Sequence, residues 1–296
     1  MRIPAGLAWW SDVPGGADWL ASLPSIVESC AERWSLRVDG PYEGGNVALV
    51  LAAELEDGTP AVLKVGFPDV ESEHEPDALR HWDGQGAARL LDSNESVRAL
   101  LVERCVPGTQ LWLVEDEDEA TVVAASVLRR IWRPAPDEHR FRTLASEAAR
   151  WAVELPAEWE VLGRPFEPRV LDEAIAACVE LGPHQGEHVV LHQDFHGGNV
   201  LRAEREPWLA IDPKPLVGER EFDAASFLRD RRWLLGRAGD AARIRRRVDL
   251  LSSELGLDRE RMRRWGIAHA LAWGFSGRKV EADMIECARL LDAARP

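Results

Sequence analysis

The sequence predicts an α+β fold of two lobes, a small β-rich N-lobe followed by a larger, mainly helical C-lobe. Strand-like apolar runs are concentrated between residues 46 and 104, whereas helical periodicity dominates from residue 115 onward. The 296 residues, of which 46% are hydrophobic, are enough to bury a sizeable core. We therefore expect an N-lobe over 1–104, including an N-terminal helical extension, and a C-lobe over 105–296.

The N-lobe pattern combines one hairpin with flanking helices. Its expected elements are a helix over 19–34, a β-hairpin of strands 47–51 and 61–65, a helix over 75–84 and a strand over 99–103. Pro24 is expected in the first turn of its helix, and Pro76 is expected to open the next one. Glycine at position 84 is expected to close that second helix.

Helical spacing of apolar residues fills most of the C-lobe. The expected helices are 115–131, 140–155, 170–181, 223–235, 240–255, 258–273 and 280–294. A β-rich island over 189–211 interrupts them, and its polar residues are the first candidates for chemistry.

Composition narrows the functional classes. The formal net charge is −15, which argues against a nucleic-acid partner and favours a cationic ligand. The four cysteines are widely spaced without a CxxC pair, which indicates free thiols in a reducing compartment. No signal peptide and no apolar run of about 18 residues is evident, so we expect a cytoplasmic protein without a membrane span.

Three polar residues in and directly after the β-rich island have the spacing that phosphoryl transfer needs. Asp194 and Asn199 lie in a loop between the apolar runs 189–191 and 200–201, and Asp212 ends the next apolar run. The reaction requires a carboxylate that orients and deprotonates the attacking hydroxyl, and hard oxygen ligands that hold Mg²⁺ on the nucleotide phosphates. We therefore assign Asp194 as the catalytic residue and Asn199 and Asp212 as metal ligands. Two glycines after His196 are expected to supply the backbone freedom for the reversal.

A zinc site is the competing interpretation of this region, because histidines recur at every fourth position. They are His184, His188, His192 and His196. Proline and glycine between the first two disfavour a helix, and residues four apart on a strand are spread over ~13 Å. We therefore expect His192 to brace the loop by hydrogen bonding rather than to bind zinc.

The N-lobe supplies a matching context for a kinase. Lys64 lies on the second strand of the expected hairpin, and Glu75 opens the helix that follows. Alone, the Asp194–Asn199 spacing is a weak signal, but this order of lysine, glutamate, catalytic loop and Asp212 is typical of kinases.

These residues resemble the aminoglycoside phosphotransferase superfamily, and within it the aminoglycoside/hydroxyurea resistance kinases. The similarity covers nearly the whole chain and is strongest over 191–223, which begins LHQDFHGGN and includes the specific string REPWLAIDP at 205–213. Supporting stretches are 61–65, 75–79, 82–84 and 101–104. The resemblance implies a bilobal protein-kinase-like fold that binds ATP, with GTP as an alternative nucleotide, together with Mg²⁺.

The resemblance also implies roles for further residues. Lys64 would contact the α- and β-phosphates and Glu75 would hold it, while the backbone from 101 through Glu103 to Cys105 would meet the purine. Asp223 matches a buried residue that supports the catalytic loop, although its position before alanine also suits a helix N-cap.

The chain departs from the superfamily pattern at two places. Gln193 stands where glycine is usual, and the stretch 39–46, expected to cover the phosphates, is not a Gly-x-Gly-x-x-Gly loop. The C-terminal helices resemble streptomycin kinases less than the rest, so the candidate acceptor carboxylates come from charge alone. They are Asp230, Glu281 and Asp283.

The leading hypothesis is an ATP-dependent phosphotransferase acting on a hydroxyl of a small, polar, cationic aminoglycoside such as streptomycin. A second is a kinase of hydroxyurea, an amino sugar or another small metabolite. A nucleotide-binding protein without turnover and a protein kinase are the remaining alternatives, the latter disfavoured because no long activation segment follows Asp212. We expect a monomer or a homodimer.

Overall fold

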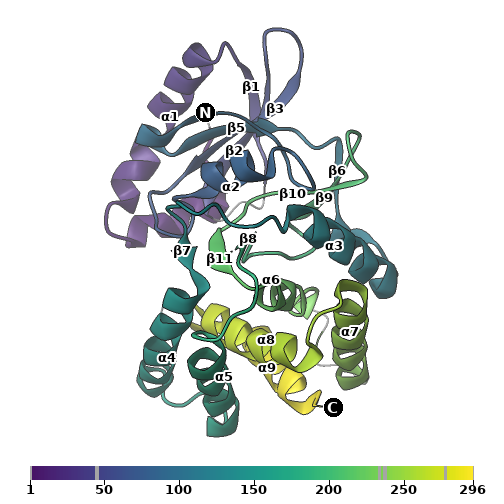
Figure 1. Ribbon diagram of the computed structural model, residues 1–296. Coiled ribbons are helices and arrows are strands. Elements are labelled where there is room, and N and C mark those ends of the chain that lie inside the picture. The colour runs from purple at the N-terminus through teal and green to yellow at the C-terminus, as the bar shows by residue number, and fades with distance from the viewer. Residues whose placement is uncertain (1, 44–46, 233–234, 236–238, 277–278, 296) are drawn as a thin grey trace. The chain divides into compact units, whose positions relative to one another are not determined.

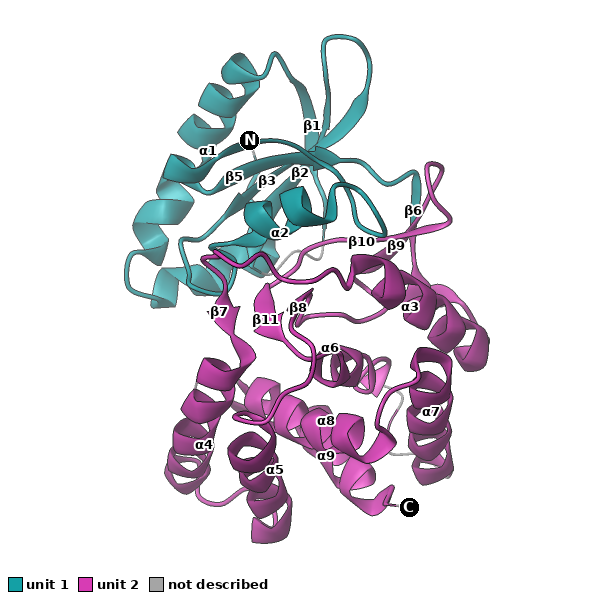
Figure 2. Ribbon diagram, in the orientation of Figure 1, with its two compact units in different colours: residues 1–108 teal, residues 109–296 magenta. Residues whose placement is uncertain are grey.

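The computed structural model describes residues 2–43, 47–232, 235, 239–276 and 279–295. The chain separates into two compact units, Met1–Gly108 and Thr109–Pro296 (Figure 2). The sequence-based boundary at residue 104 lies just before this division. The strand β6 (Pro107–Gln110) carries the chain from one unit into the next.

The first unit is built on a five-stranded antiparallel sheet of order β1-β2-β3-β5-β4 (Figure 1). Its strands are β1 (Arg37–Pro41), β2 (Ala48–Glu54), β3 (Pro60–Gly66), β4 (Leu90–Asn94) and β5 (Ala99–Glu103). Its helices are η1 (Ala5–Asp12), α1 (Gly16–Arg33), α2 (Glu75–Trp82) and η2 (Glu95–Val97). The expected hairpin is therefore confirmed as β2 and β3, whereas β1 and β4 were not predicted.

Alternation along β3 decides which side chains reach the candidate site. Ala61, Leu63 and Val65 belong to the core cluster that also contains Leu7 and Leu23 of η1 and α1. Because successive side chains of a strand point to opposite faces, Lys64 faces away from that core. Pro24 lies inside α1 rather than in its first turn, since the helix begins at Gly16.

The second unit contains seven helices among its described residues. They are α3 (Glu117–Ile131), α4 (Leu144–Val161), α5 (Pro168–Leu181), α6 (Arg220–Phe227), α7 (Asp240–Leu255), α8 (Arg259–Gly274) and α9 (Ala282–Ala293), preceded by η3 (Leu111–Leu113). Short strands form sheets of order β10-β9-β6, β7-β11-β8 and β12-β13. These strands are β7 (Arg142–Thr143), β8 (Val189–Leu191), β9 (Val200–Ala203), β10 (Trp208–Ala210), β11 (Leu216–Gly218), β12 (Phe275–Ser276) and β13 (Lys279–Val280).

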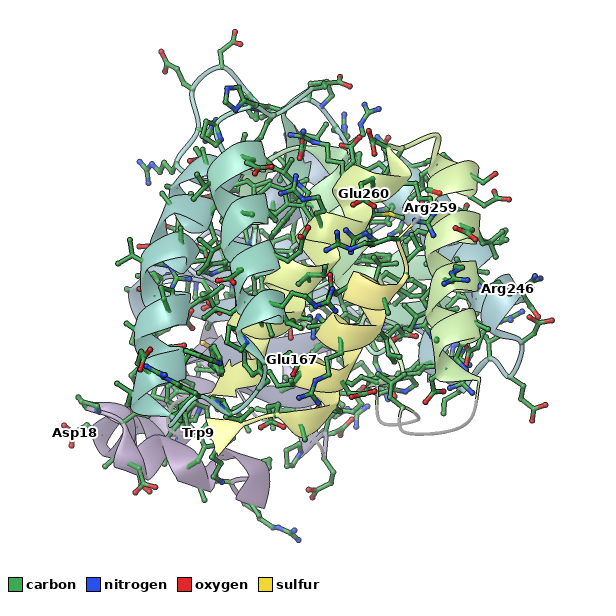
Figure 3. The ribbon with its side chains drawn as sticks, turned by 90° about the horizontal axis from the view of Figure 1, so that it is seen from below. Trp9, Asp18, Glu167, Arg246, Arg259 and Glu260 are labelled. Carbon is green, nitrogen blue, oxygen red and sulfur yellow. The ribbon has the colours of Figure 1, made fainter. Side chains whose placement is uncertain are left out.

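Helix α8 is the central support of this unit and packs against α9, α5, α6, α7 and α4. Its first residues, Arg259 and Glu260, are labelled in Figure 3. Its buried residues lie all round the helix, which is typical of a core helix. Even Arg263 is fully buried, where it pairs with Glu260 and donates to the carbonyl of Leu291 at 2.9 Å.

The expected bounds of two helices were wrong. Helix α4, expected over 140–155, begins at Leu144 and continues through Pro156 to Val161. Helix α6, expected over 223–235, begins at Arg220 and ends at Phe227. Residues 233–234 and 236–238 lie outside the described residues. No helix in the described ranges is long and apolar enough to cross a lipid bilayer.

Candidate active site

Lys64 and Glu75 form a buried ion pair within the first unit. The ammonium Nζ of Lys64 lies 2.7 and 2.6 Å from the two carboxylate oxygens of Glu75, and the residues are 9% and 3% exposed. Pro76 at the start of α2 fixes Glu75 in the first turn, on the sheet face to which Lys64 points. The hairpin and the following helix thus bring together the two residues that the sequence paired.

Glu103 and Cys105 follow at the end of β5. The amide of Glu103 donates to the carbonyl of Arg89 at 2.8 Å, and its carboxylate accepts from the amide of Arg89 at 3.0 Å. Cys105 is 9% exposed. Of the expected phosphate-covering stretch 39–46, residues up to Pro41 belong to β1, and residues 44–46 lie outside the described residues.

The loop from His192 to Asn199 joins β8 to β9 and is tied by hydrogen bonds within itself. The Asp194 amide donates to the carbonyl of His192 at 2.8 Å, and the Asn199 amide donates to the carbonyl of His196 at 2.8 Å. The Nδ2 of Asn199 also donates to the carbonyl of Asp194 at 3.0 Å. Asp194 and Asn199 are therefore held in one tight loop, as their spacing implied.

The buried carboxylate of Asp223 accepts hydrogen bonds from the first residues of this loop. The amides of His192 and Gln193 donate to it at 3.0 and 2.8 Å, and the indole Nε1 of Trp132 donates at 2.9 Å. Burial raises the pKa of the Asp223 carboxyl despite these donors. Asp223 lies inside α6, whose N-cap is Glu219, so the N-cap interpretation was wrong.

Three further residues on α6 and the turn after it contact the same loop. The sequence did not reveal Ser226 and Arg229, and it suggested a different role for Asp230, as a candidate acceptor carboxylate. The hydroxyl of Ser226 donates to the carbonyl of Phe195 at 3.0 Å, and Asp230 accepts from the amide of Gly197 at 2.8 Å. Arg229 forms an ion pair with Asp194. The segment 223–230 therefore contacts the loop from its first residue to Gly197.

The electrostatics of Asp194 favour an ionised carboxylate. Burial alone would raise the pKa of this group, but the positive charges near it, above all the guanidinium of Arg229, together outweigh the effect of burial. The pKa of Asp194 therefore lies well below its usual 3.8.

The two histidines of the loop are held neutral by burial. His192 donates from Nε2 to the carbonyl of Ile211 at 2.9 Å, and burial lowers its pKa. His196 accepts from the amide of Gly198 on Nδ1 at 3.0 Å, and burial lowers its pKa to about 4. His184 bonds instead to the carbonyl of Glu180, and the described residues contain no group of three His, Cys, Asp or Glu that could hold a metal.

Asn199 and Asp212 are brought together by one backbone bond. The amide of Ile211 donates to the carbonyl of Asn199 at 2.9 Å, which places Asp212 one residue beyond the contact. Because the Nδ2 of Asn199 is used by the loop, its amide oxygen remains as a hard ligand. Asp212 adopts a left-handed backbone with φ of 58°. An amide and a carboxylate oxygen suit Mg²⁺, which binds few protein ligands and takes the rest from phosphates and water.

The departure from the family pattern at Gln193 has a structural explanation. Gln193 has φ of 64°, the left-handed region in which glycine is favoured, and its side chain accepts from Arg142 at 3.4 Å.

Gly197 and Gly198 do not have positive φ. An added Cβ there would lie 2.8 Å from the backbone nitrogen of Trp112 and 2.6 Å from its ring, respectively, so these glycines are needed for space rather than for backbone freedom.

The candidate acceptor carboxylates differ in environment. Asp230 is 3% exposed and bound to the loop, whereas Asp283 pairs with Arg232 at 3.0 Å. Glu281 occupies the N-cap position of α9, but its side chain makes no capping hydrogen bond. The carboxylate of Asp230 is thus already used as a hydrogen-bond acceptor within the fold. The roles of all three toward an acceptor stay predictions.

Comparison with known proteins decides the family. The family model for aminoglycoside/hydroxyurea antibiotic resistance kinases matches residues 33–280. The chain belongs to this family. Its relatives include streptomycin 6-kinase from Streptomyces griseus, 41% identical over 92% of this chain and 89% of the relative. Hydroxyurea phosphotransferase from Kitasatospora aureofaciens is 42% identical over 92% of this chain and 78% of the relative.

Solved structures place the family in the expected fold class. An aminoglycoside phosphotransferase, solved as a thermostable mutant, aligns with a TM-score of 0.61 at 16% identity, covering 90% of this chain and 96% of its own. A choline kinase from Streptococcus pneumoniae aligns with a TM-score of 0.62 at 11% identity, covering 92% and 99%. The α+β, protein-kinase-like expectation is therefore confirmed.

Proposed function

We propose that this family member is an ATP-dependent kinase that phosphorylates a hydroxyl of an aminoglycoside such as streptomycin. The observation that carries the proposal is the loop geometry around Asp194. Its carboxylate is ionised, one oxygen faces Arg229 and His196, and the other accepts no hydrogen bond from the described residues. A carboxylate so arranged can accept a hydrogen bond from an attacking hydroxyl.

In this mechanism Asp194 orients the acceptor hydroxyl and takes its proton as the oxygen attacks the γ-phosphorus and ADP departs. Asn199 and Asp212 would hold Mg²⁺, which neutralises charge on the phosphates when bound. His192 and Asp223 keep the loop in place.

Residues of the first unit would bind the nucleotide. We assign contact with the α- and β-phosphates to Lys64, held by Glu75, and contact with the purine to the backbone from Glu103 to Cys105. ATP is the first candidate and GTP the alternative. We further propose a cytoplasmic location, where ATP is available and the four buried cysteines would stay free thiols.

Streptomycin is the first acceptor to test because the streptomycin kinase relative covers most of the chain and because a net charge of −15 favours a cation. Hydroxyurea is the second candidate, since the relative named for that activity is equally similar. An amino sugar or other metabolite is a further alternative. A nucleotide-binding protein without turnover would show binding of ATP but transfer to none of these.

The test is a nucleotide-consumption assay over streptomycin, other aminoglycosides, hydroxyurea and amino sugars, with phosphorylated product identified by mass spectrometry. Transfer to streptomycin supports the leading proposal, and transfer to hydroxyurea alone supports the second. Asp194→Ala should remove nearly all transfer while ATP still binds. Retention of most activity by that variant would refute the role of Asp194.

A further inference from the structure

Arg229 is a buried cation that binds one oxygen of the proposed catalytic carboxylate. The residue is 4% exposed, and its Nη2 is paired with Oδ1 of Asp194. The Nε2 of His196 lies 3.7 Å from the same oxygen. Oδ2 of Asp194 accepts no hydrogen bond within the described part of the chain. The two carboxylate oxygens therefore have different surroundings.

The guanidinium of Arg229 is itself supported by an aromatic ring. Its central carbon lies 4.7 Å from the ring centroid of Trp273, in the last turn of α8. His269, one turn earlier, stacks on Trp273 with centroids 5.3 Å apart and planes at 8°. His269 also donates from Nε2 to the carbonyl of Gln193 at 3.0 Å. The Trp273 ring under Arg229 is thus linked, through His269, to the loop that contains Asp194.

The backbone on both sides of Arg229 is fixed as well. Arg247 of α7 donates from Nη1 to the carbonyls of Leu228 and Asp230, at 3.0 and 2.6 Å. Asp230 accepts from the amide of Gly197 at 2.8 Å. The backbone at Arg229 therefore cannot shift relative to the loop without breaking contacts with α7 and with Gly197.

We propose that Arg229, supported by Trp273, is a positioning residue that fixes Oδ1 of Asp194 and so presents Oδ2 to the acceptor hydroxyl. This inference rests on the proposed kinase function and deepens it. A planar guanidinium suits the role because it holds its donors in a fixed direction, which a single ammonium does not. Misplacement of a reacting group by about 1 Å can cost about 100-fold in rate.

The competing explanation is that Arg229 merely balances a buried charge for folding. The two explanations predict different kinetics. A structural loss reduces the amount of folded enzyme, whereas a loss of positioning lowers kcat in the folded enzyme with little change in the KM for ATP.

The first test compares Arg229→Met with Arg229→Lys and with the matched control Arg263→Met, a fully buried, ion-paired arginine of α8 outside the site. We expect Arg229→Met to lower kcat about 100-fold with the KM for ATP changed less than about 3-fold. Arg229→Lys should recover about 10-fold of that loss. Arg263→Met should lower Tm comparably but keep kcat within about 3-fold. A kcat for Arg229→Met within 3-fold of wild type would overturn the proposal.

The second test asks whether Trp273 acts through Arg229. Trp273→Leu should lower kcat about 10-fold alone but cause little further loss in the Arg229→Met background, since both changes remove one support. Fully additive losses would show that Trp273 does not support Arg229.

A third measurement does not depend on turnover and separates this inference from the proposed function. If Arg229 holds Asp194, the double variant Asp194→Asn/Arg229→Met should have a Tm at or above that of Arg229→Met alone, because no buried charge is left unpaired. Additive losses of Tm would overturn the inference. Wild-type enzyme that transfers phosphate to none of the acceptors would instead defeat the proposed function, while the Tm comparison still decides whether the pair exists.

Discussion

Two buried ion pairs, one in each unit, each include a residue with a proposed role in the reaction. Lys64 is neutralised by Glu75, and Asp194 by Arg229. Breaking a buried pair by removing one partner is costly, because the remaining charge has lost its compensation. Surface pairs are worth far less, which supplies controls within the same molecule.

The ion pair of the first unit can be tested with Glu75→Gln. The amide still accepts one hydrogen bond but carries no charge, so Lys64 should be held less firmly and the KM for ATP should rise about 10-fold. The free energy of unfolding should fall by about 3 kcal/mol. Kinetics at varied ATP and urea denaturation provide the two measurements.

Glu73→Gln is the matched control, since Glu73 pairs with Arg98 at 3.2 Å on the exposed surface of the same unit. It should change unfolding by less than about 0.5 kcal/mol and leave the KM unchanged. Equal effects of the two substitutions would argue against a special role for Glu75.

The free energy of unfolding should depend on pH because His269 is buried in its neutral form. Burial lowers its pKa from 6.5 to about 3, so the folded protein binds this proton only at strongly acidic pH, whereas the unfolded chain binds it below 6.5. The stabilisation that comes from keeping His269 neutral is therefore complete above pH 6.5 and is lost progressively as the pH falls toward 3. Between pH 7.5 and pH 5 the free energy of unfolding should fall by about 2 kcal/mol for this reason.

His269→Gln should keep the hydrogen bond to the Gln193 carbonyl and remove this titration, so its stability should fall less steeply between pH 7.5 and 5. Denaturation curves at the two pH values measure the difference. The exposed His188→Gln is the control and should follow wild type. Identical slopes for all three proteins would contradict the assignment to His269.

At the scale of elements, the catalytic loop is shaped by its neighbours as much as by its own sequence. Asp223, Ser226 and Asp230 contact it from α6 and the following turn, and Trp112 packs against its two glycines. The loop is consequently constrained on two sides within the second unit.

The two glycines of the loop should respond differently to a compensating change. Gly197→Ala and Gly198→Ala should each lower stability by about 2 kcal/mol and reduce kcat, because the added methyl groups clash. At Gly198 the main obstacle is the ring of Trp112, so Trp112→Leu should restore most of the loss. At Gly197 the obstacle is the backbone nitrogen of Trp112, so the same change should restore little.

Each rescue is judged against Trp112→Leu alone, by thermal denaturation and by kcat, in a double-mutant cycle. Rescue of both glycine variants, or of neither, would contradict the packing described here.

The sequence predicted correctly those helices and strands that are marked by the pattern of apolar residues within the segment itself. Strands β5 and β8 and helix α7 were placed at their observed bounds, since apolar periodicity marks them. Pro24 and Pro156 misled the assignments because both prolines are accommodated inside helices that tertiary packing stabilises.

The site residues likewise divide into those that local sequence indicates and those that only the folded structure reveals. Asp194, Asn199 and Lys64 were proposed from spacing and resemblance, and the structure gives them a geometry consistent with those roles. Arg229 gave no signal, because one arginine among several in an apparently helical run looks like a solvated residue. Its partner is 35 positions away, and only folding brings the two together.

At the scale of the whole molecule, the net charge of −15 should act on the rate at which acceptors arrive. A cationic acceptor is attracted by this field, whereas a neutral one is not. Salt shortens the range of the field to about 10 Å at 0.1 M.

At saturating ATP, raising ionic strength from about 0.02 to 0.3 M should lower kcat/KM for streptomycin by about 10-fold. The value for neutral hydroxyurea should change by less than about 2-fold. Steady-state kinetics over this salt range check the prediction. Equal salt dependence for both acceptors would mean that the protein's charge does not steer them.

The contacts between segment 223–230 and the catalytic loop also bear on how such enzymes diverge. Asp223, Ser226, Arg229 and Asp230 contact separate groups of residues 192–197. A substitution in one segment therefore changes the contacts available to the other, so we expect the two segments to change together among related enzymes. Chimeras that exchange the loop between relatives should work only when the 223–230 segment is exchanged with it.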